Sequence, residues 1–430
     1  MRYLLFLILV LPVTGFGQYT LTVTVKDAED LKPVPYATVL FPAQDYAFSA
    51  NGNGRFVLKV NTMEMDRAVV ISSIGYDEYR TTLGAMVEGG ITEVFLSPKV
   101  TMLEEVLVKA EKETAKELVE EASKRLREYL KEDPYYLYAF YRETLKQDQQ
   151  FVGFTEAYGV LHIPGYQPSY NKKNRLFSYD LAQWKNIRRS HYKVRTTCDT
   201  AGHVLDIHKL LKAKSEYLYN GPLSKKIKEF TYSIDSLTSY RGNDVFIVGF
   251  QSPGREEDYR GHILIKADDY AVMGLRVVHS NLGALLGLDC HELDSSQFEV
   301  TFTTVGERYY LNTLSLTMTG RIGGQMREKK LRLRGGEFKA NKIQKLNYDQ
   351  RMVIYQEMIN PVIHYDPSFW EQNGDDIEVS LAEDLGENEP LAQQFFKWDG
   401  QRIVPLPDNF DTYEELYKNE DIFRLFMNNQ

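Results

Sequence analysis

The sequence predicts a mainly β fold, with a small N-terminal antiparallel β-sandwich followed by an α+β domain built on an antiparallel sheet. The composition is rich in residues that favour strands, with 29 Tyr and 22 Phe. Short alternating apolar and polar runs, separated by turn residues, fill roughly the first hundred positions. One amphipathic segment then precedes longer alternating runs, which is the order typical of an α+β domain.

Residues 1–17 have the pattern of a secretory signal peptide. One basic residue, Arg2, precedes a short apolar run, and small residues lie just before Gln18. We therefore expect an exported protein, in the periplasm or at the outer-membrane periphery. The formal net charge of −9 argues against nucleic acid as a partner, because nucleic-acid binders carry basic faces.

The segment 18–110 is predicted to be the β-sandwich. No amphipathic helix separates its alternating runs, and the stretch 51–54 (Asn-Gly-Asn-Gly) is expected to form a hairpin turn. A calcium loop would need several carboxylates there, whereas amides and glycines suit a tight turn. The expected strands are "TLTVTV" (20–25), "YATVLF" (36–41), "GRFVLKV" (54–60), "AVVISSI" (68–74) and "ITEVFL" (91–96).

Three blocks of this segment resemble the carboxypeptidase-like regulatory domain, a transthyretin-like sandwich of exported proteins in Bacteroidetes-type bacteria. They are "PVPYATV" (33–39), "NGNGRFVL" (51–58) and "VISSIGYDEY" (70–79), and "LEEVLV" (103–108) continues the similarity. The resemblance implies an interaction or stability module. In relatives that are enzymes the zinc ligands lie in a separate catalytic domain, which this sequence does not show.

The remaining chain is predicted to contain three further parts. Segment 111–134 is a linker helix that begins with a capping box at Thr114 and Glu117 and packs on the second domain. Segment 135–359 is the sheet-rich α+β domain, and segment 360–430 is acidic with a terminal helix.

Within the second domain, "GHILIKADDYAVMGLRV" (261–277) and "GERYYLNTLSL" (306–316) distantly resemble the half-barrel of periplasmic lipoprotein carriers. This resemblance implies a sheet curved as a half-barrel and an apolar groove beneath helices. "DPSFWEQ" (366–372) resembles the closing segment of exported proteins that carry the regulatory domain.

Two groups of residues are candidate binding sites. A basic cluster would offer an anionic-ligand face, although charges that protect an outer strand from edge pairing are the favoured explanation. An aromatic cluster would line a groove, although strand alternation assigns half of the aromatic side chains of this region to the core. The residues are Arg327, Lys329, Lys330, Arg332 and Arg334 in the first group, and Tyr136, Tyr138, Phe140 and Tyr158 in the second.

No catalytic motif, metal-ligand spacing or cofactor fingerprint is found in the sequence. Cys198 and Cys290 form one disulfide or remain two buried thiols. The sequence therefore predicts a non-catalytic envelope protein that binds a protein, a lipid or a glycan, with lipid or lipoprotein handling and peripheral membrane association as finer possibilities. The alternative is a hydrolase of envelope polymers whose catalytic residues are scattered through the second domain.

Overall fold

The computed structural model describes residues 18–44, 46–99, 114–129, 135–163, 180–191, 193, 207–219, 221–224, 226–252, 259–280, 292–305, 308–322, 324–339, 365–374 and 377–396. The predicted signal peptide, both cysteines and the predicted terminal helix lie outside these residues. The predicted domain boundaries near 17, 110, 134 and 359 lie outside them as well.

The N-terminal region is a sandwich of two small sheets that share one buried core. The stretch 51–54 forms the predicted turn, in which Asn51 Oδ1 accepts the N–H groups of Asn53 and Arg55 at 3.0 and 2.8 Å. The strand pairs of this sandwich are antiparallel except for one, because the last strand, β7, pairs parallel with β1. The first sheet has the order β4 (Arg55–Asn61), β1 (Gln18–Asp27), β7 (Glu93–Leu96), and the second has the order β3 (Tyr46–Ser49), β2 (Thr38–Phe41), β5 (Ala68–Ser72), β6 (Tyr79–Thr82), followed by helix α1 (Leu83–Glu88).

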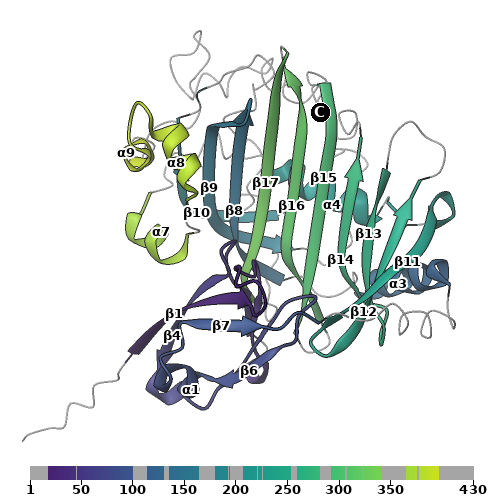
Figure 1. Ribbon diagram of the computed structural model, residues 1–430, viewed down its shortest axis with the longest axis horizontal. Coiled ribbons are helices and arrows are strands. Elements are labelled where there is room, and N and C mark those ends of the chain that lie inside the picture. The colour runs from purple at the N-terminus through teal and green to yellow at the C-terminus, as the bar shows by residue number, and fades with distance from the viewer. Residues whose placement is uncertain are drawn as a thin grey trace, which may run out of the picture.

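The second region is built on one open, ten-stranded sheet in which all neighbours are antiparallel (Figure 1). The predicted mainly β fold is thereby confirmed. The last strand in sequence, β17, lies in the interior of the sheet, between β16 and β8. In spatial order the strands are β10 (Asp180–Arg189), β9 (Gln150–Ile163), β8 (Tyr135–Gln147), β17 (Gln325–Lys339), β16 (Arg308–Ile322), β15 (Glu292–Val305), β14 (Val272–His279), β13 (Tyr259–Lys266), β12 (Asn243–Gln251) and β11 (Thr231–Tyr240).

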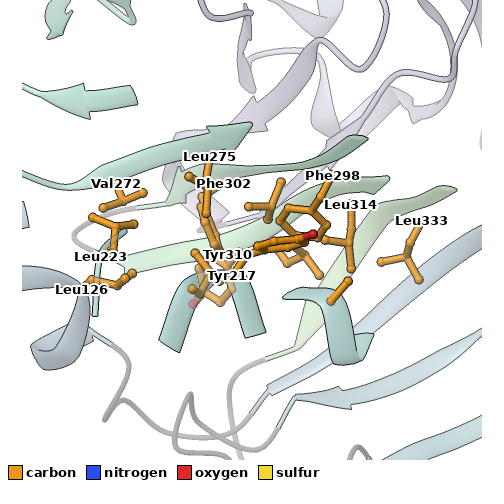
Figure 2. Packing of buried hydrophobic residues seen from close by; sticks show 14 of the residues in the cluster. Leu126, Tyr217, Leu223, Val272, Leu275, Phe298, Phe302, Tyr310, Leu314 and Leu333 are labelled. Carbon is orange, nitrogen blue, oxygen red and sulfur yellow. The ribbon is translucent and has the colours of Figure 1, made fainter. Parts of the chain in front are cut away.

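Helices α3 (Ala115–Tyr129) and α4 (Ile207–Tyr219) cover one face of this sheet, which we call the helix face. The capping box forms as predicted, since the Thr114 hydroxyl accepts the Glu117 N–H while the Glu117 carboxylate accepts the Thr114 N–H. Apolar side chains fill the interface between these helices and the strands (Figure 2). Burial of this apolar area is the main force that holds helices and sheet together.

The opposite face of the sheet, which we call the outer face, is partly covered by other elements. Strand alternation places Phe140 and Arg142 of β8 on this face, whereas Ala139 and Tyr141 face the helices. Three C-terminal helices lie over β9 and β10, where Phe151 and Phe154 pack against their apolar residues. These helices are α7 (Pro367–Asn373), α8 (Val379–Gly386) and α9 (Leu391–Phe396).

The sandwich is attached to the large sheet at two places. Strand β3 lies against β17, and the Arg334 guanidinium donates to the Ser49 carbonyl at 3.1 Å. At the second place the Gly75 N–H donates to the Ser239 carbonyl of β11 at 2.8 Å, and Tyr76 forms a parallel bridge with Tyr240. The turn at Gly75 therefore joins the two regions.

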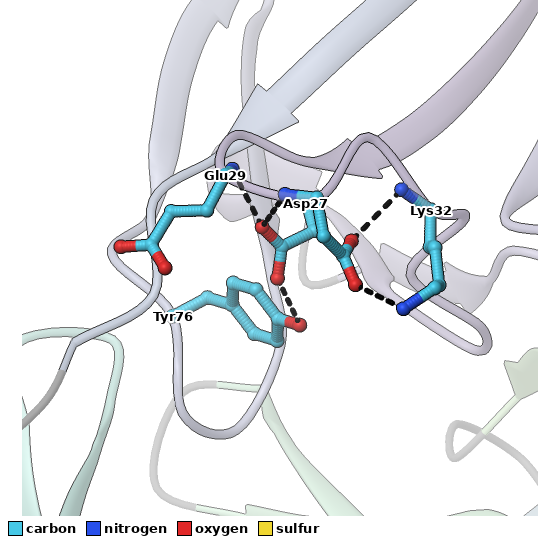
Figure 3. Close-up of polar contacts among 5 residues, drawn as sticks. Asp27, Glu29, Lys32 and Tyr76 are labelled. Atoms are coloured by element: carbon cyan, nitrogen blue, oxygen red, sulfur yellow. Dashed lines mark hydrogen bonds and ion pairs between the residues drawn. The ribbon is translucent and has the colours of Figure 1, made fainter.

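A polar turn beside β1 holds the second attachment in position (Figure 3). The Asp27 carboxylate accepts the Tyr76 hydroxyl at 3.0 Å and the Glu29 N–H at 2.7 Å. Burial of the ring, together with the Asp27 carboxylate, raises the pKa of Tyr76 to about 12. Tyr76 is therefore a neutral hydrogen-bond donor at physiological pH, as this arrangement requires.

Candidate functional site

The predicted basic cluster lies on β17, an interior strand of the sheet. The interpretation that these charges protect an outer strand from edge pairing was therefore wrong, because both sides of β17 are hydrogen-bonded to neighbours. The sequence did not reveal this, because only one strand partner, β16, is adjacent in the chain, whereas the other, β8, lies almost 200 residues earlier. The charges on β17 need a different explanation.

The strand separates the five basic residues into two groups. Arg327 and Lys329 lie on the same side as the buried Leu331 and have partners on β8. Lys329 Nζ is 2.8 Å from the carboxylate of Glu143, and Arg327 Nε donates to the Gln147 side-chain oxygen at 3.1 Å. We therefore correct the predicted single face and remove these two residues from it.

Lys330, Arg332 and Arg334 project together on the outer face, and we call them the basic row. Arg334 is buried and connects three elements: its guanidinium carbon lies 4.2 Å from the Phe140 ring centroid, and its nitrogens donate to the carbonyls of Ser49 and Asn373. These contacts hold the sandwich and α7 on the sheet. Arg334 therefore has a structural position within the basic row.

Lys330 and Arg332 are partly exposed. The Arg332 guanidinium carbon lies 5.3 Å from the centroid of the Tyr36 ring, which comes from the sandwich. Burial lowers the pKa of Lys330, and the neighbouring Arg332 charge lowers it further, while Glu328 and Glu378 act in the opposite direction. These two side chains present positive charge between the sandwich and the C-terminal helices.

Three of the four predicted aromatic residues form one cluster beside the basic row. Tyr158 packs against Tyr138 and Phe140, with ring centroids 6.3 and 4.8 Å apart. Phe369 of α7 closes the cluster, at 5.0 Å from Tyr158. The predicted groove is thus occupied by a side chain of the same chain, although the rings of β8 and β9 remain only partly buried.

Tyr136, the fourth residue, faces the same way at the end of β8, opposite Lys339 of β17. Burial raises the pKa of Tyr158 to about 12, with further effects from Tyr138 and Glu337. Tyr46 of the sandwich also has a pKa raised to about 12, by burial and by the same Glu337 carboxylate. These phenols are neutral donors at physiological pH.

A buried ion triad supports this part of the outer face and was missed in the sequence. The Glu156 carboxylate is 2% exposed and binds two guanidinium groups, with Arg142 Nη2 at 2.6 Å on one oxygen and Arg188 Nε at 2.6 Å on the other. Arg188 also lies 4.7 Å from the Trp370 ring of α7. The sequence signal was that Glu156 is the only charged residue in the run 151–161. Its two partners are separated from it by 14 and 32 residues in the chain.

A second buried charge lies on the helix face and was also missed. Lys214 of α4 is 3% exposed, and burial lowers its pKa to about 8. The surrounding α4 residues Leu210, Leu211 and Leu218 belong to the apolar core. A buried amine of this kind is a candidate for function or a site of reduced stability.

Other polar arrangements in the described residues do not assemble a recognised centre. Ser233, Asp235 and His262 lie together on β11 and β13, but the Ser233 hydroxyl donates to Asp235 rather than to the imidazole. No group of three His, Cys, Asp or Glu residues suited to a metal ion occurs within the described part of the chain. Of the helices described, none is long and apolar enough to cross a membrane.

No protein-family model matches the chain, and no curated protein matches it. Similar solved structures include a DUF1329 family protein from Desulfovibrio piger, with 8% identity and a TM-score of 0.25, covering 56% of this chain and all of that one. MucB of Pseudomonas aeruginosa, in its complex with MucA, has 8% identity and a TM-score of 0.17 over 52% of this chain and 99% of the other. A membrane-associated protein of unknown function from Bacteroides fragilis has 10% identity and a TM-score of 0.15, over 75% and 99% of the two chains. At these TM-scores the similarities carry no argument about function, and the resemblance to the regulatory domain stays a prediction.

Proposed function

We propose that this protein is a non-catalytic, exported envelope protein that binds a ligand or partner through the outer face of its ten-stranded sheet. The observation that carries the proposal is the juxtaposition of the basic row with the aromatic cluster, in which Arg334 of β17 lies directly opposite Phe140 of β8. Partly exposed aromatic and arginine side chains are the residue types that contribute most to binding surfaces. The periplasm or the outer-membrane periphery is the proposed location.

The packing of the helix face favours the outer face as the place where a ligand binds. A carrier that holds acyl chains between helices and sheet needs space there, whereas the α3 residues Leu118, Val119 and Ala122 are buried in a packed core. If the protein handles lipid or lipoprotein, we therefore place the ligand on the outer face. A lipid, a glycan or an envelope protein would each use the rings for apolar contact and the cations for polar contact.

The hydrolase alternative requires a carboxyl group with a raised pKa in a cleft. Hydrogen bonds to the carboxylate lower the pKa of four described carboxyl groups, which is the direction opposite to that of a general acid. These groups are Asp30, Glu117, Asp269 and Asp366. No specific observation favours this alternative. We therefore propose a non-catalytic role for the protein.

The test is native mass spectrometry of the full chain after export into a bacterial periplasm, with lipid and glycan analysis of the extract. We expect a stoichiometric co-purified molecule, and we expect its occupancy to fall when Tyr138→Ala removes a half-buried ring from the cluster. Tyr19→Ala is the matched control, because Tyr19 is 44% exposed and lies on the sandwich. A bare wild-type chain, or equal loss in both variants, would contradict the proposal.

A further inference from the structure

We propose that Lys330 and Arg332 form a binding site for a phosphate group on the outer face, an inference that rests on the proposed function and names the chemistry of its ligand. The phosphate group belongs either to a lipid headgroup or to a free phosphate ester. Three features of the molecule favour this site: the local excess of positive charge, the geometry of the two side chains and the buried residues that hold the strands beneath them.

Four charged residues occupy successive strands in one row across the outer face. Arg332 of β17 lies opposite Arg142 of β8, Arg142 lies opposite Glu156 of β9, and Glu156 lies opposite Arg188 of β10. Among these four residues Glu156 is the only carboxylate, and Arg142 and Arg188 occupy both of its oxygens. On the other side of Arg332 the next strand, β16, presents the neutral Ser315, and Glu299 of β15 is two strands away. Arg332 therefore faces another arginine, and like charges directly opposite each other destabilise a sheet.

Lys330 adds to this excess. It lies two residues before Arg332 on the same face of β17, roughly 7 Å along the strand. Among the described residues, no carboxylate forms an ion pair with Lys330 or Arg332. The lowered pKa of Lys330, caused by burial and then by Arg332, has the sign expected of an amine held beside another cation. An anion bound between the two side chains would relieve this repulsion.

The two side chains differ in a way that suits phosphate. Arginine presents a planar fork that binds two oxygens of a phosphate, while lysine acts as a mobile point charge on a third. The Arg332 guanidinium is already oriented by the Tyr36 ring, at 5.3 Å. The neighbouring Arg334 and the triad at Glu156 are buried, so the strands beneath the site are held in place. Less ordering of the protein is then needed when the anion binds.

The experiment measures binding to the full wild-type chain with two probes that separate the sources of the phosphate group. One probe is inorganic phosphate, followed by calorimetry. The other is a vesicle of phosphatidylglycerol and phosphatidylcholine, compared with pure phosphatidylcholine in a sedimentation assay. The variants are Arg332→Gln and Lys330→Gln. The matched control is Arg276→Gln, which removes the same charge from an exposed position on β14 of the same face.

We expect at least one phosphate-bearing probe to bind, and each site variant to weaken its binding about tenfold, while Arg276→Gln changes it less than twofold. If the site variants weaken binding to the vesicles alone, the phosphate group belongs to a lipid headgroup. If they weaken binding of inorganic phosphate alone, it belongs to a free phosphate ester. No binding of either probe, or equal weakening by Arg276→Gln, overturns the phosphate site. The co-purification experiment uses neither probe and therefore tests the proposed function separately. If it finds a bound neutral lipid or glycan while neither phosphate probe binds, the proposed function is supported and the phosphate site is wrong.

Discussion

The two faces of the ten-stranded sheet differ in how they are filled, although the same strands supply both. On β17, Leu331 and Leu333 project into the core on the side covered by α4, while Lys330, Arg332 and Arg334 project from the other side. The helix face is therefore a packed apolar interface, and the outer face carries charges and partly exposed rings. Burial on the helix face therefore stabilises the fold, whereas the charged and aromatic side chains that a partner could contact lie on the outer face.

The largest effect is expected at Glu156, a carboxylate that is deeply buried on the outer face. Glu156→Gln should lower the free energy of unfolding by about 3–5 kcal/mol, because it removes the buried carboxylate that the guanidinium groups of Arg142 and Arg188 share. Urea unfolding measures the change. Glu299→Gln on the exposed part of the same face is the control, with an expected change within about 0.5 kcal/mol. A loss below about 1 kcal/mol for Glu156→Gln would show that this triad does not stabilise the outer face.

A comparable loss should follow on the helix face from simple removal of volume. Leu118 of α3 is 1% exposed, so Leu118→Ala should cost about 2–5 kcal/mol through lost transfer energy and a residual cavity. Leu31→Ala, at a position 60% exposed, is the control and should be nearly neutral. Equal, small effects of both substitutions would mean that α3 does not pack on the sheet as described.

Lys214 breaks the apolar pattern of the helix face, so its replacement should stabilise the protein. Burial lowers its pKa to about 8 in the folded protein, against an ordinary value of 10.5. Between these pH values the unfolded chain binds more protons than the folded protein, so the stability of the wild type rises with pH. The free-energy cost of burying the charged Lys214 amine is therefore present in full below about pH 8 and is absent above about pH 10.5. Lys214→Met should therefore raise the free energy of unfolding at pH 7 by up to about 3 kcal/mol.

The measurement for Lys214 is the difference in unfolding free energy between variant and wild type from pH 7 to 10.5. This difference should be nearly constant from pH 7 to about 8 and then decline towards pH 10.5, because only the wild type gains stability as its amine loses a proton. A difference that is independent of pH would contradict the lowered pKa. A loss of stability in Lys214→Met at pH 7 would mean that the contacts of the charged amine outweigh the cost of its burial.

The smallest effects should separate the members of the basic row. Arg334→Gln should cost about 1–3 kcal/mol, because the carbonyls of Ser49 and Asn373 lose their charged donor. Arg332→Gln should cost at most about 1 kcal/mol, the value of a contact between a cation and a ring. Thermal unfolding of both variants tests this order, and the reverse order would make Arg332 the structural residue of the row.

Local features of this protein were determined by the sequence alone. Alternation of apolar and polar residues defines strands such as β8, and the Thr114–Glu117 box defines the start of α3, because each depends on contacts a few residues apart. The turn at Asn51 follows for the same reason. The basic and aromatic residues of the outer face were also recognisable, since they lie within single strands.

Only the tertiary structure decided what surrounds those residues. The pairing of β17 with β8 joins residues such as Arg332 and Arg142, and it placed the basic row inside the sheet rather than at an edge. The triad at Glu156 and the closure of the aromatic cluster by Phe369 likewise bring together side chains from separate elements. Many strand orders satisfy the same alternating pattern. The choice among them depends on how the whole chain buries its apolar area, and this cannot be read from any one segment.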